Sequence, residues 1–252
     1  VGLKALHSVF SPEFRSTSTD PGAGLKVNVY YGCVTLDELH DIQSLWPQMI
    51  ATLNEYRIED WHAIRDIVEE WAYPGRMLAS IPAEVYDGMK AFACQMLLDV
   101  VEIAQDRPRV LHWAAEVSRQ AELGLQVPLD PIFEILFPPE DLENWRSEQK
   151  RQLEAVTELA RRWIHQDPAT AAAEIVSIER ESHCVGPQPW PRYTPNLCRE
   201  LAQTAASSNE WWAAMIGAGA EPDLVEPFLR RAAEIEEPGW TVLAARCLEH
   251  PP

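Results

Sequence analysis

His183, Cys184 and Cys198 are the residues in this sequence that most suggest a zinc site. Structural zinc binds four nitrogen or sulfur ligands, which usually come in closely spaced pairs. Neither half of this set has that spacing, and a fourth ligand would have to come from elsewhere. We therefore predict no metal site. We interpret His183 as a helix-end residue, where an imidazole meets free carbonyl groups, and Cys198 as a half-buried thiol.

Glu59 and His62 have the Glu-x-x-His spacing that di-iron carboxylate proteins use on two of their helices. The nearest second copy is Asp37 with His40, which departs from the pattern. Both pairs fall in the first turns of expected helices, where the positive end of the helix dipole favours a carboxylate. We therefore expect no iron and no other cofactor.

Motifs for nucleophilic catalysis or phosphate binding are absent from the sequence. There is no Gly-x-Ser-x-Gly turn, and the few glycines stand at the ends of expected helices. We therefore predict no catalytic residues and a non-enzymatic role. One alternative stays open, an enzyme built of helices whose site is assembled from distant residues.

Ten tryptophans are the remaining unusual feature. Six lie on expected apolar helix faces, where a role in the core is favoured: Trp46, Trp61, Trp71, Trp113, Trp145 and Trp163. The candidates for contact with a partner are Trp190, Tyr193, Trp211, Trp212 and Trp240. Trp190 stands between prolines, so it either anchors a partner or covers the end of the helical array. Trp211 and Trp212 point about 100° apart on a helix, so we expect one of them to be partly exposed or to fill a gap between repeats.

The elements that must position these residues are almost all helices. An apolar stripe at steps of three and four residues predicts a helix over 82–104: Val85, Met89, Phe92, Met96, Val100 and Ile103. Stripes and capping signals predict further helices at 36–56 with a break or kink at Pro47, and at 59–72, 106–124, 140–164, 168–182, 195–206, 208–217, 223–236 and 239–249. The strand signal is confined to 25–32, as a short hairpin or as docked extended chain.

A weak internal repeat indicates how the helices are arranged. Ala-Ala-Glu followed by Val or Ile recurs at 114–117, 172–175 and 232–235. Chance in an Ala-rich sequence is the alternative explanation. We predict an all-α fold, a right-handed α-solenoid of antiparallel helical hairpins of the HEAT or TPR type, with a short extended N-terminal segment.

Proline marks the expected division of the chain. Residues 1–35 form an extended or irregular segment, and 36–183 form a block of long helices. Residues 184–194 form a joint, and 195–252 form a block of shorter helices in the same solenoid. Prolines at every second position from Pro187 to Pro191 predict a stiff, polyproline-like joint with Trp190 pinned against one block.

The net charge of −18 narrows the classes of partner. Such an acidic surface repels phosphate groups, which argues against nucleic acid and against an anionic membrane. No stretch approaches the roughly 20 apolar residues that span a bilayer. Five irregularly spaced cysteines favour a reducing, cytoplasmic compartment over a disulfide framework. The sequence opens on Val1 and ends in "EHPP", so we expect a segment of a longer polypeptide.

Residues 30–75 resemble the helical-repeat regions of large bacterial STAND- or NACHT-type NTPases. The resemblance is carried by "VNVYYG", by "VTLDELHDIQSLWPQM" and by the pattern from Trp61 to Pro74. In that family a variable α-solenoid senses a ligand or partner while a separate domain hydrolyses ATP. The resemblance carries over no functional residue, because these residues contain no nucleotide-binding motif.

Together these features predict a non-enzymatic helical module that binds a protein or peptide partner, with a sensing or scaffolding role in signalling or defence. The other domains of the same polypeptide are further expected partners. A structural spacer or oligomerisation module is the alternative. The sequence does not identify the partner.

Overall fold

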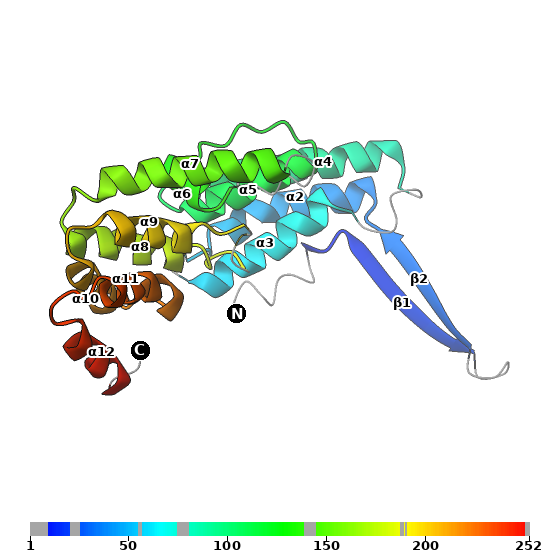
Figure 1. The fold of residues 1–252 in the computed structure, drawn as a ribbon. Coiled ribbons are helices and arrows are strands. Elements are labelled where there is room, and N and C mark those ends of the chain that lie inside the picture. Colours follow the sequence, from blue (N-terminus) through cyan, green and yellow to red (C-terminus); the bar gives the residue numbers. More distant parts are fainter. Residues whose placement is uncertain are drawn as a thin grey trace. The chain divides into compact units, whose positions relative to one another are not determined.

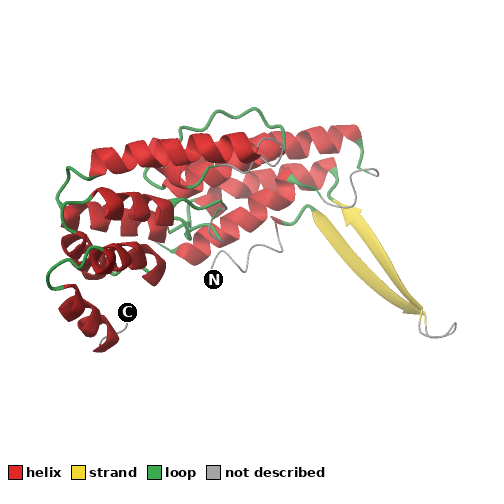
Figure 2. Cartoon of the chain, viewed as in Figure 1, coloured by secondary structure: helices red, strands yellow, loops and turns green. Residues whose placement is uncertain are grey.

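The computed structural model describes residues 10–20, 26–54, 57–74, 81–138, 145–186, 189 and 191–249. Its regular elements are mostly helices, drawn in Figure 1 and coloured by type in Figure 2. This confirms the expected helical character, to which the structure adds one two-stranded sheet. No helix in the described part of the chain is long and apolar enough to cross a lipid bilayer.

The chain forms two compact units. Unit 1 consists of Val1–Pro128 with Cys184–Gly186, and unit 2 consists of Leu129–His183 with Pro187–Pro252. The sequence predicts a division at 184–194 instead. The structure differs because the helix before the proline-rich stretch, at 168–181, and the helix after it, at 194–204, belong to the same hydrophobic core. Pro187, Gln188 and Trp190 lie outside the described residues, so the stiff joint stays a prediction.

Unit 1 begins with an antiparallel hairpin of β1 (Glu13–Asp20) and β2 (Lys26–Cys33), drawn in yellow in Figure 2. The register runs from Glu13 opposite Cys33 to Asp20 opposite Lys26. The N–H of Val34 donates to the carbonyl of Pro12 at 3.0 Å and so extends the pairing by one step. Of the two expected arrangements for 25–32, the structure has the hairpin, and it supplies a partner strand that the sequence did not predict.

Four helices follow among the described residues of unit 1: α2 (Leu36–Ile50), α3 (Ile58–Ala72), α4 (Ala83–Ile103) and α5 (Pro108–Gln120). Thr35 and Glu38 form the expected capping box at the start of α2. The expected break at Pro47 with a second helical piece is wrong, because α2 continues to Ile50 and the chain then turns. One proline near the end of a helix removes one hydrogen bond, and the N–H of Ala51 still donates to the carbonyl of Pro47 at 3.2 Å.

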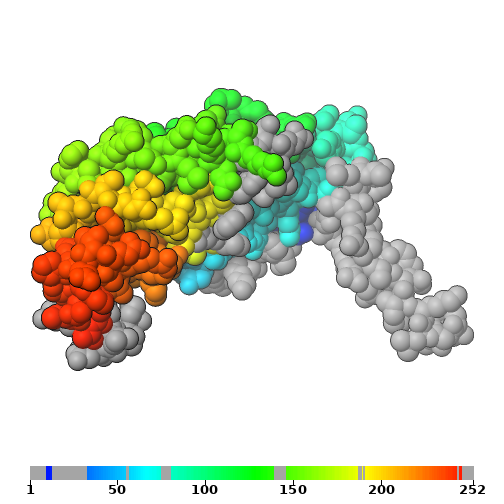
Figure 3. Space-filling view, in the orientation of Figure 1, coloured from blue at the N-terminus to red at the C-terminus, as the bar shows by residue number. Residues whose placement is uncertain are grey.

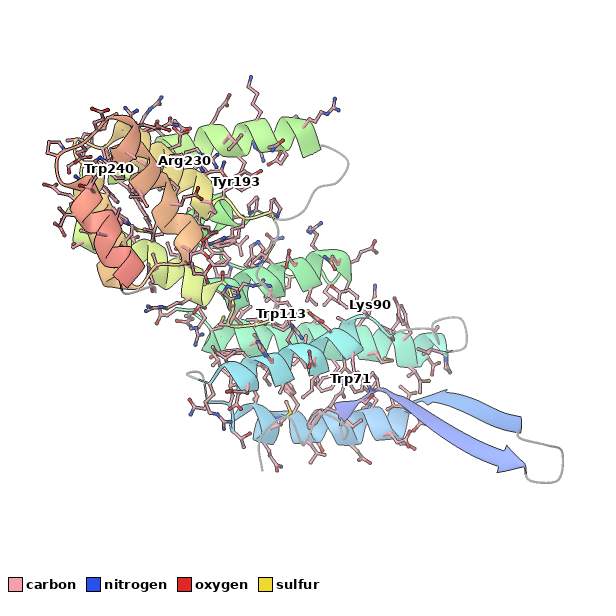
Figure 4. All side chains as sticks on the ribbon, turned by 60° about the horizontal axis from the view of Figure 1, so that its bottom comes forward. Trp71, Lys90, Trp113, Tyr193, Arg230 and Trp240 are labelled. Carbon is pink, nitrogen blue, oxygen red and sulfur yellow. The ribbon has the colours of Figure 1, made fainter. Side chains whose placement is uncertain are left out.

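A series of aromatic rings in edge-to-face contact lies in the core of unit 1. Phe10 lies edge-on to Trp46, Trp46 to Phe92, and Phe92 to Trp71, with centroids 6.2, 6.2 and 4.9 Å apart. These are favourable edge-to-face distances. The indole Nε1–H of Trp71, labelled in Figure 4, also donates to the carbonyl oxygen of Phe10 at 2.6 Å. The rings thereby join Phe10 to α2, α3 and α4.

Unit 2 contains seven helices among its described residues: α6 (Pro131–Leu136), α7 (Trp145–Trp163), α8 (Pro168–Glu181), α9 (Thr194–Thr204), α10 (Ser208–Ala218), α11 (Pro222–Glu234) and α12 (Trp240–Glu249). Asp167 caps α8, as expected, by accepting from the N–H of Thr170. The sequence did not predict α6, which Asp130 caps, because six residues are too short to show a helical period.

Alternate helices pack together in unit 2. α7 packs on α9 and α9 on α11, while α8 packs on α10, which also contacts α11 and α12. The two repeated Ala-Ala-Glu segments of unit 2 are not equivalent. Ile175 is fully buried, but Ile235, at the matching position of the last copy, is 47% exposed because it follows the end of α11.

A candidate partner-binding groove between α2 and α4

An open groove with a volume of about 630 Å³ lies between α2 and α4, the blue and turquoise helices of Figure 1. The buried rings of Trp46 and Phe92 form its floor. The other lining residues are Gln43, Pro47 and Ile50 from α2, and Ala91, Gln95, Asp99, Glu102 and Ile103 from α4.

The lining residues follow the period of the two helices. Positions 43, 46, 47 and 50 lie on one face of α2, and positions 91, 92, 95, 99, 102 and 103 lie on one face of α4. Five of the six residues in the expected apolar stripe of α4 are buried. The sixth, Ile103, is 36% exposed. Ile103 is the last residue of α4, and its side chain lines the groove instead of the core.

A proline inside α2 changes the hydrogen bonding along the groove. Pro47 has no N–H, so the carbonyl of Gln43, one turn earlier, loses its usual intrahelical donor. Both residues line the groove.

Two carboxylates give the groove a negative charge. The indole Nε1–H of Trp46 donates to Oδ2 of Asp99 at 2.7 Å, and Nε2 of Gln95 donates to Oδ1 of Asp99 at 2.8 Å. Glu102 is exposed one turn further along α4. Since the lining contains no Lys or Arg, the groove attracts cationic groups.

Three of the aromatic residues expected to contact a partner are buried in the core of unit 2. Trp211, Trp212 and Tyr193 are 3%, 1% and 5% exposed. Of the two alternatives expected for this pair, partial exposure is therefore wrong, while the filling of a gap between repeats stays a prediction. α10 packs against both α8 and α11, so two rings that point about 100° apart are both covered. Their burial removes these three side chains from the surface of the unit.

Specific contacts account for this burial. Trp211 stacks on Phe228 of α11, with ring centroids 5.8 Å apart and planes 4° from parallel. The backbone N–H of Tyr193 donates to the carbonyl of Leu136 at 2.8 Å. Burial, with a smaller effect of the Glu148 charge, raises the pKa of the Tyr193 phenol.

The other two candidate aromatic residues have different outcomes. Trp240, labelled in Figure 4, begins α12 and is half-buried, so part of its ring faces solvent. Trp190 lies outside the described residues. The set expected from the sequence therefore does not form a single surface among the described residues of unit 2.

The residues considered as zinc ligands have separate environments. Cys184 is buried among the residues of unit 1, and Cys198 lies in the core of unit 2, where burial raises the pKa of its thiol. His183 is exposed. Within the described ranges, no group of three or more His, Cys, Asp or Glu residues is arranged to hold a metal ion.

A buried charged network in unit 1 was missed from the sequence. Nη1 of Arg109 lies 3.5 Å from Nδ1 of His112 and 3.8 Å from Oε2 of Glu116. Burial lowers the pKa of Arg109, and the charge of Glu116 opposes that shift. Nε1–H of Trp113 donates to Oε1 of Glu69 at 2.8 Å and so links α5 to α3. We interpret these buried groups as stabilising the packing of α5 on α3. Positions 109, 112 and 116 share one helix face, and this spacing is the sequence signal that could have predicted the network.

Unit 2 has a second cavity of about 380 Å³ between α9 and α11, which adjoin on the surface seen in Figure 3. Its charged lining residues are Arg199, Arg230, Arg231, Asp223, Glu226 and Glu234. Arg230 pairs with Glu226, and Arg231 with Glu234. The charges of this cavity are therefore balanced within unit 2, unlike those of the α2–α4 groove.

Comparisons of the chain with protein-family models, with curated protein sequences and with solved structures each find no match. Function is therefore inferred from the geometry of the chain itself.

Proposed function

We propose that this chain is a non-enzymatic helical-repeat module that binds a protein or peptide partner in the α2–α4 groove. The observation that carries the proposal is the groove itself, which combines a floor of apolar rings with an acidic rim. Ile50 and Ile103 at its edges give a partner apolar surface to cover.

We further infer that the helices form an α-solenoid. The supporting pattern is the packing of alternate helices within each unit: α2 on α4 and α3 on α5, then α7, α9 and α11 in succession, and α8, α10 and α12 in succession. Equivalent helices of successive hairpins stack in this way in solenoids. The handedness, the HEAT or TPR type, the cytoplasmic location and the relation to bacterial STAND or NACHT proteins stay predictions from the sequence.

A peptide-display selection against the purified chain tests the proposal. Ala91 is an exposed residue that lines the groove, so Ala91→Trp fills the groove without changing the core. Ala173 is an exposed residue in the middle of α8, and Ala173→Trp is the matched control. Peptides enriched on the unmodified chain should bind the Ala173→Trp variant equally well and lose at least about ten-fold in affinity for Ala91→Trp.

Two results would contradict the proposal. Enriched peptides that bind Ala91→Trp as tightly as the unmodified chain would place binding elsewhere. A concentration-dependent dimer in sedimentation velocity, abolished by Ala91→Trp, would favour the alternative of an oligomerisation module. Circular dichroism spectra of both variants show whether the helical fold is kept.

A further inference from the structure

We propose that the partner segment in the α2–α4 groove is a basic amphipathic helix of about three turns, supplied by another protein. This inference rests on the proposed function and adds the charge and the conformation of the ligand. Three observations support it: the charge of the two helices, the path of the lining residues, and the acceptor groups along the walls.

The charge of α2 and α4 favours a cationic partner. The two helices carry seven acidic residues against a single Lys: Asp37, Glu38, Asp41, Glu84, Asp87, Asp99 and Glu102 against Lys90. The ammonium group of Lys90 lies 5.4 Å from the centre of the Tyr86 ring, and Lys90 does not line the groove. Charges of one sign near a groove speed the approach of an oppositely charged partner and disfavour acidic ones.

The path of the lining residues favours a helix over an extended strand. On α4 they run from Ala91 to Ile103, which corresponds to about 18 Å at 1.5 Å per residue. A partner helix of about 12 residues covers that length. An extended peptide gains affinity by pairing with the open edge of a sheet, whereas both walls of this groove are helices whose main-chain groups are mostly bonded within the helix.

The polar groups of the groove point to donors on the partner. Glu102 is exposed at the groove, so its carboxylate is open to donors on a partner. Each carboxylate oxygen of Asp99 already accepts a hydrogen bond, one from Trp46 and one from Gln95. Asp99 therefore contributes mainly its negative charge to the groove. Arginine and lysine side chains carry several donors and no acceptor, which matches this set. The apolar face of the same helix would cover Ile50, Ala91 and Ile103.

Fluorescence anisotropy with three labelled synthetic peptides of about 14 residues tests the inference. The first peptide is an amphipathic helix of Leu and Arg. The second has the same pattern with Glu in place of Arg. The third has the composition of the first in an order without helical period. We expect the first peptide to bind at least about ten-fold more tightly than either of the others at low salt.

Two variants separate specific docking from general attraction to an acidic surface. Glu102→Gln removes one charge from the groove, and we expect it to weaken binding of the basic helix about five-fold. Glu84→Gln removes an exposed charge from the first turn of α4, outside the groove. We expect it to change the affinity for the basic peptide less than two-fold. Ala91→Trp should abolish binding, and Ala173→Trp should leave it unchanged.

The outcomes distinguish a wrong ligand from a wrong binding site. If the acidic peptide binds best and Ala91→Trp still blocks it, the groove binds partners but the basic helix is the wrong ligand. If the unordered basic peptide binds as well as the amphipathic one, the conformation is wrong. If Ala91→Trp leaves binding of the basic helix intact, or if the chain binds its own copy in the groove, this inference and the proposed site fail together.

Discussion

Trp46 and Asp99 connect the two walls of the groove. The indole Nε1–H of Trp46, on α2, donates to Oδ2 of Asp99, on α4, at 2.7 Å. Trp46 is 1% exposed, whereas Asp99 is half-buried at the surface of the groove. The buried Trp46 ring therefore forms part of the groove floor, and the half-buried Asp99 carboxylate adds its charge there.

We predict that this hydrogen bond couples the two residues by about 1.5 kcal/mol, because its acceptor carries a charge. Urea unfolding of Trp46→Phe, Asp99→Ala and the double variant measures the coupling as a double-mutant cycle. The control cycle combines Asp99→Ala with Trp163→Phe, a buried tryptophan of unit 2, and should be additive within about 0.5 kcal/mol. Equal coupling in both cycles would show that the effect does not come from the hydrogen bond.

A second prediction concerns Gly186, which lies against Arg65. Gly186 has a φ of +124°, and an added Cβ would stand 1.8 Å from Nη1 of Arg65. That Nη1 donates to the carbonyl of Val185 at 2.9 Å. An Ala at 186 must therefore adopt an unfavourable backbone conformation and displace the guanidinium from its acceptor. We expect Gly186→Ala to lower the free energy of unfolding by about 2 kcal/mol.

Gly217 provides the matched control for this substitution. It lies inside α10, and an added Cβ would meet nothing within 4 Å. Because Gly is a poor helix residue, Gly217→Ala should raise the free energy of unfolding by about 0.5–1 kcal/mol. If Gly186→Ala were also neutral or stabilising in urea unfolding, the close contact with Arg65 would not constrain the fold.

Local signals in the sequence predicted the helices well, and long-range packing explains what they did not predict. Thr35 and Asp167 cap helices through atoms three residues away, so their role is visible in a short stretch of sequence. The hydrogen bond from Arg65 to Val185 joins residues 120 positions apart. No local pattern indicates that residues 184–186 belong to the first unit, so the expected boundary was misplaced.

The candidate site was missed for a related reason. A helical stripe shows which residues share a face, but it does not show how many neighbouring helices cover the other faces. Trp211 and Trp212 are both buried because α10 packs against α8 on one side and α11 on another. Ile103 belongs to the same stripe as Phe92, yet it is exposed because it lines the groove. Aromatic content alone therefore directed the prediction to the core of unit 2 instead of the α2–α4 groove.

A third prediction concerns the ion pairs of Arg192 in unit 2. Nη2 of Arg192 lies 3.1 Å from Oε2 of Glu179 and 3.7 Å from Oε2 of Glu221, and Nη1 bonds to Asp223. Glu179 is 5% exposed, so Arg192→Met removes an ion-pair partner from a buried carboxylate. We expect a loss of about 3 kcal/mol in the free energy of unfolding.

Arg161→Met is the control for this prediction. Arg161 forms an ion pair with Glu158 in which both side chains are exposed. Exposed pairs of this kind contribute little, so the control should change stability by less than about 0.5 kcal/mol. Equal effects of the two substitutions in urea unfolding would contradict the role assigned to the buried pair.

A final prediction concerns stability at high pH and the phenol of Tyr73. Partial burial, followed by the charges of Glu69 and Glu116, raises the pKa of Tyr73 to about 12 from 10.0. Because the folded state then favours the neutral phenol more than the unfolded state does, this contribution to stability is fully present below pH 10. It is lost as the pH rises from about 10 to about 12. Urea unfolding along this pH series should show a smaller alkaline loss for Tyr73→Phe than for the unmodified chain. Subtracting the absorbance titration of Tyr73→Phe from that of the unmodified chain gives the ionisation of Tyr73 alone. We expect its midpoint near pH 12, and a midpoint near pH 10 would refute the prediction.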